Sequence, residues 1–333
     1  MLPLALSLGD PAGIGPELIA ACWAERRGVD LPPFFVVGGA RLLVEAAATR
    51  GIALPVAAIS DPAQAAACFD DALPVLDNLD GSYAPGQPDA AGARLALASL
   101  EQAMALVTRR AAAGLVTSPV AKAELAQVGF AFPGQTEFVA HACGMAAEEA
   151  VMMLAGPALR TVPLTVHCPL SSVPGLLSAE LIVRRCTIVA HAMQRDFGIA
   201  APRLSICGLN PHAGENGRMG DEEQRIIAPA IAALRAAGWN ASGPHPADAL
   251  FTPRARATYD VAIAMYHDQA LIPLKALDFD QGVNVTLGLP VVRTSPDHGT
   301  AFGIAGRNLA DPGATIAAIR MAADLAVRRS AST

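Results

Sequence analysis

The sequence predicts an α/β fold built on a mainly parallel sheet, and three observations support this prediction. Short apolar segments alternate along the chain with Ala-rich segments of helical length, as in βαβ units. Several of the short segments are apolar at every position, as expected for strands that helices cover on both faces. The length of 333 residues suggests about two domains.

The individual elements follow from this pattern in chain order. The first apolar segment ends in the Gly-Asp-Pro-Ala-Gly sequence at 9–13, which predicts a turn, and Pro16 suits the first turn of the helix after it. The same alternation predicts strands at 4–8, 34–37, 73–76, 114–117, 151–154, 161–166, 203–207, 261–265 and 283–287. It predicts helices at 16–26, 40–50, 92–112, 137–143, 179–197, 221–237 and 314–328.

Composition argues against several functional classes. The formal charge of −6 disfavours nucleic acid or an anionic membrane as a partner, because both select a basic face. Charged residues make up 16% of the chain, against about 25% in typical domains, which suggests extra buried surface and an oligomer. The mean hydropathy of +0.38 comes from alanine, and no window approaches the roughly 18 apolar residues of a membrane helix. We expect neither a membrane span nor a secretory signal.

Three of the seven histidines stand where an apolar segment ends: His167, His212 and His267. Ligands of parallel α/β sheets bind outside the carboxyl ends of the strands. Three imidazoles that arrive there from separate strands suit a divalent metal with open coordination positions. On the pattern alone, the alternative of three ordinary hydrogen-bonded loop residues stays open. Other histidines are expected to have structural or surface roles: His141 and His191 in helices, and His245 in a surface loop.

The six cysteines bear on the compartment. They contain no C-x-x-C pair, and in a chain of this size such spacing predicts reduced thiols and a cytoplasmic location. Cys168 stands beside a candidate metal ligand. We expect its side chain to be buried, because neighbouring residues of an extended chain point to opposite sides.

Polar residues provide further candidates. Asp268 follows the third of the strand-end histidines, where a carboxylate can orient an imidazole or act as a base, and Asp248 is a second carboxylate candidate. Lys275, Asn284 and Arg293 follow at intervals of nine residues between apolar flanks. Lysine and arginine have donors that suit phosphate or carboxylate. The alternative is three solvated surface residues, which the scarcity of charge elsewhere disfavours.

Glycine-rich loops add two candidate anion contacts. The loop at 9–17 opens a helix, and a helix N-terminus can hold an anion. Gln135 and Thr136 stand in another loop, where Thr136 can cap a helix or contact a ligand. No segment matches the dinucleotide-binding, P-loop or nucleophile-elbow patterns, which argues against P-loop kinases and α/β-hydrolases.

These segments resemble the family of 4-hydroxythreonine-4-phosphate dehydrogenase (PdxA), an enzyme of pyridoxal phosphate biosynthesis. The matching stretches are GDPAGIGPE (9–17), VTSPVAK (116–122), PGQTEF (133–138), LNPHAGENG (209–217), YHDQ (266–269) and LKALDFDQGVNVTLGLPVVRTSPDHGTAF (274–302). They span nearly the whole chain in family order, and the last stretch is the most specific.

The resemblance implies two α/β/α domains like those of isocitrate and isopropylmalate dehydrogenases, with the active site in the cleft between them. The domains are then discontinuous, with residues 1–130 and 290–333 in the first and residues 131–289 in the second, which carries most metal ligands. The resemblance also implies a homodimer with shared active sites. In it, His167, His212 and His267 hold a divalent metal (zinc, magnesium, cobalt or manganese), and His267 reaches across from the other protomer.

The implied reaction is the oxidation of a phosphorylated small molecule by NAD or NADP, followed by decarboxylation. It converts 4-phosphooxy-L-threonine to 3-amino-2-oxopropyl phosphate. Asp248, Asp268 and Lys275 are the catalytic candidates. The resemblance implies substrate contacts from Gln135, Thr136, Lys275, Asn284 and Arg293.

Two positions depart from the family pattern. Gln135 replaces the usual histidine at a substrate-contacting position, and an amide donates and accepts hydrogen bonds but cannot take up a proton. Gly303 stands where aspartate is common. Two alternative functions therefore stay open. One is a related decarboxylating dehydrogenase for 4-phospho-D-threonate, 4-phospho-D-erythronate or a cis-dihydrodiol carboxylate. The other is a non-catalytic protein that binds a metal or a phosphorylated metabolite.

Overall fold

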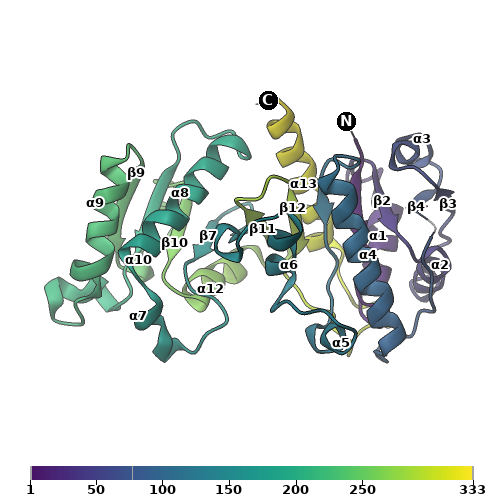
Figure 1. Ribbon diagram of the computed structural model, residues 1–333, viewed down its shortest axis with the longest axis horizontal. Helices are drawn as coiled ribbons and strands as arrows, with labels where there is room; N and C mark the ends of the chain where they lie inside the picture. Colours follow the sequence, from purple (N-terminus) through teal and green to yellow (C-terminus); the bar gives the residue numbers. More distant parts are fainter. Residues whose placement is uncertain (1, 77, 332–333) are drawn as a thin grey trace. The chain divides into compact units, whose positions relative to one another are not determined.

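The computed structural model describes residues 2–76 and 78–331 (Figure 1). The chain forms two compact units. Unit 1 joins the segment up to Ala147 to Leu289–Ser330, and unit 2 is built on Glu148–Gly288. The family resemblance implies a first boundary between residues 130 and 131. In the structure, residues 131–147, with Gln135 and Thr136, instead belong to unit 1.

Unit 1 contains a fully parallel sheet with the strand order β3-β4-β2-β1-β5-β12. Its strands are β1 (Leu4–Ser7), β2 (Phe34–Val37), β3 (Val56–Ile59), β4 (Leu73–Leu76), β5 (Leu115–Val116) and β12 (Arg293–Pro296). Every residue of β1, β2, β4 and β12 is buried. Because successive side chains of a strand point to opposite faces, this sheet is covered on both faces.

Two helices of unit 1 begin at residues that suit a helix N-terminus. Pro16 occupies the first turn of α1, and the Asp89 side chain accepts a hydrogen bond from Gly92 N at the start of α4. The helices are α1 (Gly15–Glu25), α2 (Ala40–Thr49), α3 (Ala65–Cys68), α4 (Ala90–Thr108), α5 (Lys122–Gln127), α6 (Gln135–Ala142) and α13 (Gly313–Ala331).

Unit 2 contains a mixed sheet with the strand order β11-β6-β7-β10-β8-β9. The strands are β6 (Val151–Ala155), β7 (Arg160–Pro163), β8 (Arg203–Cys207), β9 (Asn240–His245), β10 (Val261–Ala264) and β11 (Val283–Leu287). The pairs β11–β6 and β6–β7 are antiparallel. Strands β7, β10, β8 and β9 run parallel to one another, so their carboxyl ends share one edge of the sheet.

Helices of unit 2 pack around a core that strand and helix residues share. Leu154 of β6, Ala262 of β10 and Leu274 of α12 all belong to this buried cluster. The helices are α7 (Val173–Leu176), α8 (Ala179–Arg195), α9 (Ala228–Ala236), α10 (Ala247–Leu250), α11 (Pro253–Arg256) and α12 (His267–Asp278). Within residues 2–76 and 78–331, no helix combines the length and the hydrophobicity that crossing a bilayer requires.

The α/β prediction is confirmed, and each predicted strand is present. Strands β2, β4, β8 and β11 have the predicted bounds, and the ends of the others differ by up to three residues. Strands β3, β9 and β12 and helix α12 lie outside the predicted elements. The sequences of β12, β9 and α12 explain why these three were not predicted. Strand β12 reads Arg-Thr-Ser-Pro, strand β9 contains Gly-Pro, and α12 opens on polar residues and contains Pro273. The predicted helix at 221–237 is divided, because a wider π-helical turn, η5 (Glu223–Ile227), precedes α9.

An ion pair joins the amino ends of two neighbouring strands in unit 2. Asp260 precedes β10 and accepts hydrogen bonds from Arg203 N at 2.8 Å, Nε at 3.1 Å and Nη2 at 2.9 Å. These bonds from Arg203 hold the pKa of the Asp260 carboxyl below its usual value. A group with a lowered folded-state pKa stabilises the fold above its unfolded pKa, and that stability is lost as pH falls through the folded pKa.

We therefore expect Asp260→Asn to lower the free energy of unfolding by about 1 kcal/mol at neutral pH, since the Arg203 side chain is partly exposed to solvent. The difference from the parent should shrink at a pH of about 2 to 3. Denaturant unfolding midpoints at the two pH values measure it. If the difference in unfolding free energy is as large at low pH, the charge of the Asp260 carboxylate does not contribute to stability.

Candidate active site

The three strand-end histidines follow three neighbouring strands of unit 2. His167 comes shortly after β7, His267 after β10 and His212 after β8. Strand β10 pairs in parallel with both β7 and β8. The three segments therefore leave the sheet side by side at its carboxyl edge, where ligands of parallel sheets bind.

His167 and His267 approach each other within one chain. Their ring centroids lie 5.8 Å apart, and both line a cavity of about 350 Å³ together with Cys168 and Asp268. Among residues 2–76 and 78–331, no three His, Cys, Asp or Glu side chains converge into a metal-binding group. Within one chain, two of the three imidazoles share a cavity, and His212 follows the strand adjacent to the one that precedes His267.

Asp268 bonds to the imidazole beside it. Its Oδ1 lies 2.7 Å from His267 Nδ1. A carboxylate at Nδ1 favours a proton on that nitrogen and leaves the lone pair of Nε2 for a ligand, the arrangement common in metal-binding histidines. This contact makes Asp268 an orienting group for His267. Asp248 is exposed in the first turn of α10.

A buried glutamine connects the segments that carry His267 and His212. Gln269 is only 8% exposed. Its Nε2 donates to Gly208 O at 2.9 Å, and its Oε1 accepts from Met265 N at 2.7 Å. Gly208 follows β8 and Met265 follows β10, so one amide side chain ties the two strand ends together.

His212 lies in a turn with unusual backbone geometry. The five residues from His212 to Asn216 in η4 (Pro211–Gly217) have positive φ, between 42° at Glu215 and 76° at Gly214. All five lie near the left-handed helical region. Only one of them, Gly214, is a glycine, and other residues enter this region at a cost of roughly 1 kcal/mol or more each. Such a turn persists only when surrounding contacts hold it.

Unit 1 contains a buried arginine side chain. Arg293, the first residue of β12, is 4% exposed. Its Nη2 donates to Thr117 Oγ1 at 2.7 Å and to Gln135 Oε1 at 3.0 Å. Gln135 Nε2 in turn donates to Ser118 O at 3.3 Å. Burial lowers the pKa of Arg293 to about 10, so the guanidinium remains charged at neutral pH.

The surroundings of Arg293 are polar and closely packed. Thr136 and Glu137 lie in the first turn of α6, beside Gln135, and the charge of Glu137 favours protonated Arg293. Gly9, at φ +77°, lies against the segment after β5, where a Cβ would be 2.7 Å from Ser118 Cβ. A larger residue there would displace the segment that holds the Gln135 amide. Gly303 has open space around it.

The remaining predicted substrate contacts lie in unit 2. Lys275 is half-buried in the last turn of α12. Asn284 is in β11, and its buried Oδ1 has no hydrogen-bond donor among the residues the structure describes. A buried acceptor of this kind favours a ligand donor nearby.

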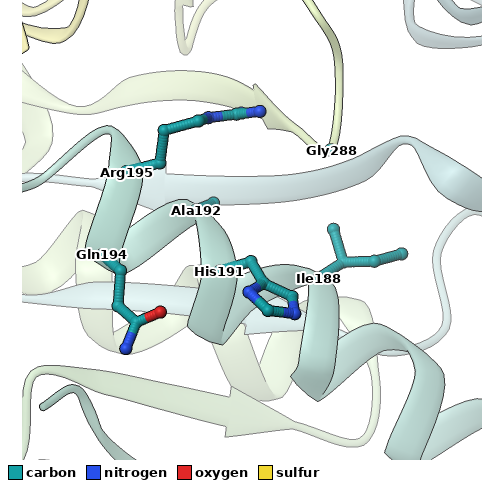
Figure 2. A pocket seen from close by; sticks show the side chains of 6 residues that line it. All are labelled: Ile188, His191, Ala192, Gln194, Arg195 and Gly288. Carbon is teal, nitrogen blue, oxygen red and sulfur yellow. The ribbon is translucent and has the colours of Figure 1, made fainter. Parts of the chain in front are cut away.

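Two further cavities lie away from the strand-end histidines. His191 of α8 lines one of about 590 Å³ with Arg195 and Gly288 (Figure 2), and its ring packs edge-on against Trp239 at 4.9 Å. His245 lines another of about 530 Å³. None of the predicted site residues lines either one.

Two expectations about side chains are wrong. His245 is not a surface-loop residue but ends strand β9, half-buried, with Nε2 2.9 Å from Ser242 Oγ. Cys168 is half-buried and lines the cavity of His167, because the chain leaves β7 before this point and no longer alternates between faces.

Sequence reasoning missed Thr117, Ser118 and Gln269 as groups that hold candidate site residues. Thr117 is the last residue of the strand predicted at 114–117, and Ser118 directly follows it. Their position at a strand end, which identified the candidate histidines, could therefore have identified these two residues as well. Gln269 carries no such signal, because its role depends on two backbone groups that only the fold brings together.

Comparisons with known proteins match most of the chain to one family. Residues 30–322 match the family model of pyridoxal phosphate biosynthetic protein PdxA. A 4-hydroxythreonine-4-phosphate dehydrogenase from Erythrobacter litoralis is 63% identical over 328 residues, which cover 98% of each chain. The crystal structure of 4-hydroxythreonine-4-phosphate dehydrogenase from Klebsiella pneumoniae superposes with a TM-score of 0.86 at 38% identity, covering 97% of this chain and 98% of that one.

A more distant structure shares the fold. A terephthalate 1,2-cis-dihydrodiol dehydrogenase from Burkholderia xenovorans is 30% identical, with a TM-score of 0.64, and covers 96% of this chain and 97% of its own. The family model and the high-identity relative each extend over most of the sequence. The chain belongs to the PdxA family of pyridoxal phosphate biosynthetic proteins.

Proposed function

We propose that this protein oxidises 4-phosphooxy-L-threonine with NAD or NADP and releases carbon dioxide, giving 3-amino-2-oxopropyl phosphate for pyridoxal phosphate synthesis. The observation that carries the proposal is the set of three histidines on adjacent strand ends, in a chain 63% identical to a protein named for this activity. The order of steps follows from the chemistry, since oxidation of the alcohol makes a β-keto acid, which loses carbon dioxide readily.

The residues present suit a divalent cation. His167, His212 and His267 would hold it, because neutral imidazoles bind zinc, cobalt and similar ions, and Asp268 orients one of them. When bound, such an ion lowers the pKa of a substrate hydroxyl and polarises the resulting ketone.

Charged and polar side chains bind the substrate in this proposal. Arg293, whose orientation Thr117 and Gln135 fix, holds an anionic group of the substrate, with Thr136 beside it. Lys275 is a further cationic anchor for the substrate, and Asn284 is a polar one. Arginine suits this task because its donors match the geometry of phosphate and carboxylate oxygens.

Proton transfer falls to groups near the reacting carbon. The hydride passes from that carbon to the nicotinamide ring, while the hydroxyl proton passes to a base. Asp248 and Lys275 are the proposed catalytic groups, and Asp268 joins them or acts only through His267. We further propose a cytoplasmic homodimer with shared active sites that binds neither nucleic acid nor membrane.

The direct test is nicotinamide reduction by the purified protein with 4-phosphooxy-L-threonine. We expect turnover with NAD or NADP that a chelator abolishes and that zinc, cobalt, manganese or magnesium restores, with one carbon dioxide released per nicotinamide reduced. Turnover that survives complete metal removal would contradict the metal assignment. Metal binding without turnover of any candidate would instead indicate a non-catalytic binding protein.

Parallel assays should test related substrates. The dihydrodiol dehydrogenase that shares this fold at 30% identity, together with glutamine at position 135, makes a cis-dihydrodiol carboxylate the second candidate. 4-Phospho-D-threonate and 4-phospho-D-erythronate complete the set. Turnover of one of these, and none of 4-phosphooxy-L-threonine, would reassign the substrate while the dehydrogenase chemistry stands.

A further inference from the structure

A buried carboxylate holds the segment that leads into the turn with His212, and the neighbouring Glu222 Oε2 also accepts from Asn210 Nδ2 at 2.7 Å. Glu223, the first residue of η5, is 3% exposed. Its Oε1 accepts hydrogen bonds from Leu209 N at 2.8 Å and Asn210 N at 2.7 Å. Its Oε2 accepts from Asn210 Nδ2 at 3.0 Å. A carboxylate that accepts from backbone N–H groups makes strong, charge-assisted bonds.

The same carboxylate lies against the left-handed turn. A Cβ on Gly214 would be 2.5 Å from Glu223 Oε2, and a Cβ on Gly208 would be 3.1 Å from Oε1. Gly214, at φ +76°, is therefore glycine for two reasons: its backbone is left-handed, and the carboxylate occupies the space of a side chain. Glu223 thus hydrogen-bonds the segment before the turn and packs against the turn itself.

These hydrogen bonds also place the turn relative to the segment of the same chain that carries His267. Glu223 fixes Leu209 and Asn210, which directly follow Gly208. Gln269 bonds Gly208 O to the strand end next to His267. Two buried side chains therefore define where the His212 turn leaves the sheet.

We propose that Glu223 is a positioning residue for His212, and that it acts by stabilising the left-handed turn at 212–216. The proposal rests on the proposed metal-binding function. It predicts that metal affinity depends on a side chain that is itself no ligand, because its effect passes through the backbone of the turn.

The test uses Glu223→Gln in the full chain. An amide has only one acceptor oxygen, and its NH₂ group would face N–H donors. We expect cobalt and zinc affinity, measured without substrate, to fall by about 10- to 100-fold. Amide hydrogen exchange in a peptide covering residues 208–217 should accelerate. Asp221→Asn is the matched control, because Asp221 is exposed and pairs only with Arg225 among the described contacts; we expect it to change neither quantity.

The outcomes separate the two proposals. If the parent protein binds neither metal, the metal assignment fails, and exchange at 208–217 still decides whether Glu223 holds the turn. If the parent binds metal and Glu223→Gln binds it equally well, the positioning role is refuted. If Glu223→Gln does not fold, Gly214→Ala takes its place, since its Cβ would displace the carboxylate. Normal metal affinity in that variant would refute the role.

Discussion

Replacing Arg293 with methionine is expected to lower kcat/KM for the phosphorylated substrate by about 10²- to 10³-fold. Truncation of one partner of a buried, hydrogen-bonded charge pair costs roughly 2–5 kcal/mol, and each 1.4 kcal/mol is about tenfold. The change removes the charge from the polar site of unit 1 and leaves Thr117 and Gln135 without its donor group. Steady-state kinetics of nicotinamide reduction measures the effect, with KM expected to rise.

Arg41→Met is the matched control for this change. Arg41 lies in α2 of the same unit with its side chain 64% exposed, near Glu45, and we expect kcat/KM within about twofold of the parent because exposed pairs contribute little. Thermal unfolding of both variants checks the fold. A folded Arg293→Met protein with unchanged KM would show that the anion binds elsewhere.

Replacing His212 with alanine is the second large change. Loss of a metal worth several kcal/mol to the transition state corresponds to a fall in kcat of about 10³-fold. The reason is geometric: His212 extends from the strand end beside the one that carries His267, and the remaining pair would bind the ion weakly. Turnover at saturating substrate over a range of added cobalt or zinc measures both affinity and rate.

His141→Ala serves as the comparison for His212→Ala. His141 lies in the last turn of α6 with its ring 5.1 Å from that of Phe132, and its loss should leave metal dependence unchanged. Turnover at ordinary metal concentrations in His212→Ala would remove this histidine from the ligand set.

Much of the fold was predictable because apolar segments of this chain are short and separated by long helical ones. Prediction fails for segments that are buried although their residues are polar. Strand β12 is fully buried but begins with Arg293, and no apolar pattern marks such a strand. Helix α12 begins at His267, in a stretch that sequence analysis assigns to the end of a strand. The backbone turns into a helix there, and Gln269 in its first turn bonds back to both strand ends.

The candidate site residues could be predicted from the sequence, but the contacts that hold them in place could not. Histidines at strand ends follow from the sequence, since parallel strands share a carboxyl edge. The left-handed turn does not, because Ala213, Glu215 and Asn216 carry no preference strong enough to indicate it. Glu223 was not predictable either. A glutamate in a polar segment is usually solvated, and its burial depends on backbone groups that only the folded chain brings within reach.

The burial of Arg293 has a consequence for how fast an anion can be captured. A guanidinium in bulk water must shed its hydration shell before it can bind a partner closely. Here, folding has already removed most of that water and replaced it with the Thr117 hydroxyl and the Gln135 amide. In the proposed role of Arg293 as substrate anchor, an arriving anion would meet a group that needs little reorganisation. Most of the dehydration of this guanidinium therefore occurs once, during folding, and would not be repeated in each catalytic cycle.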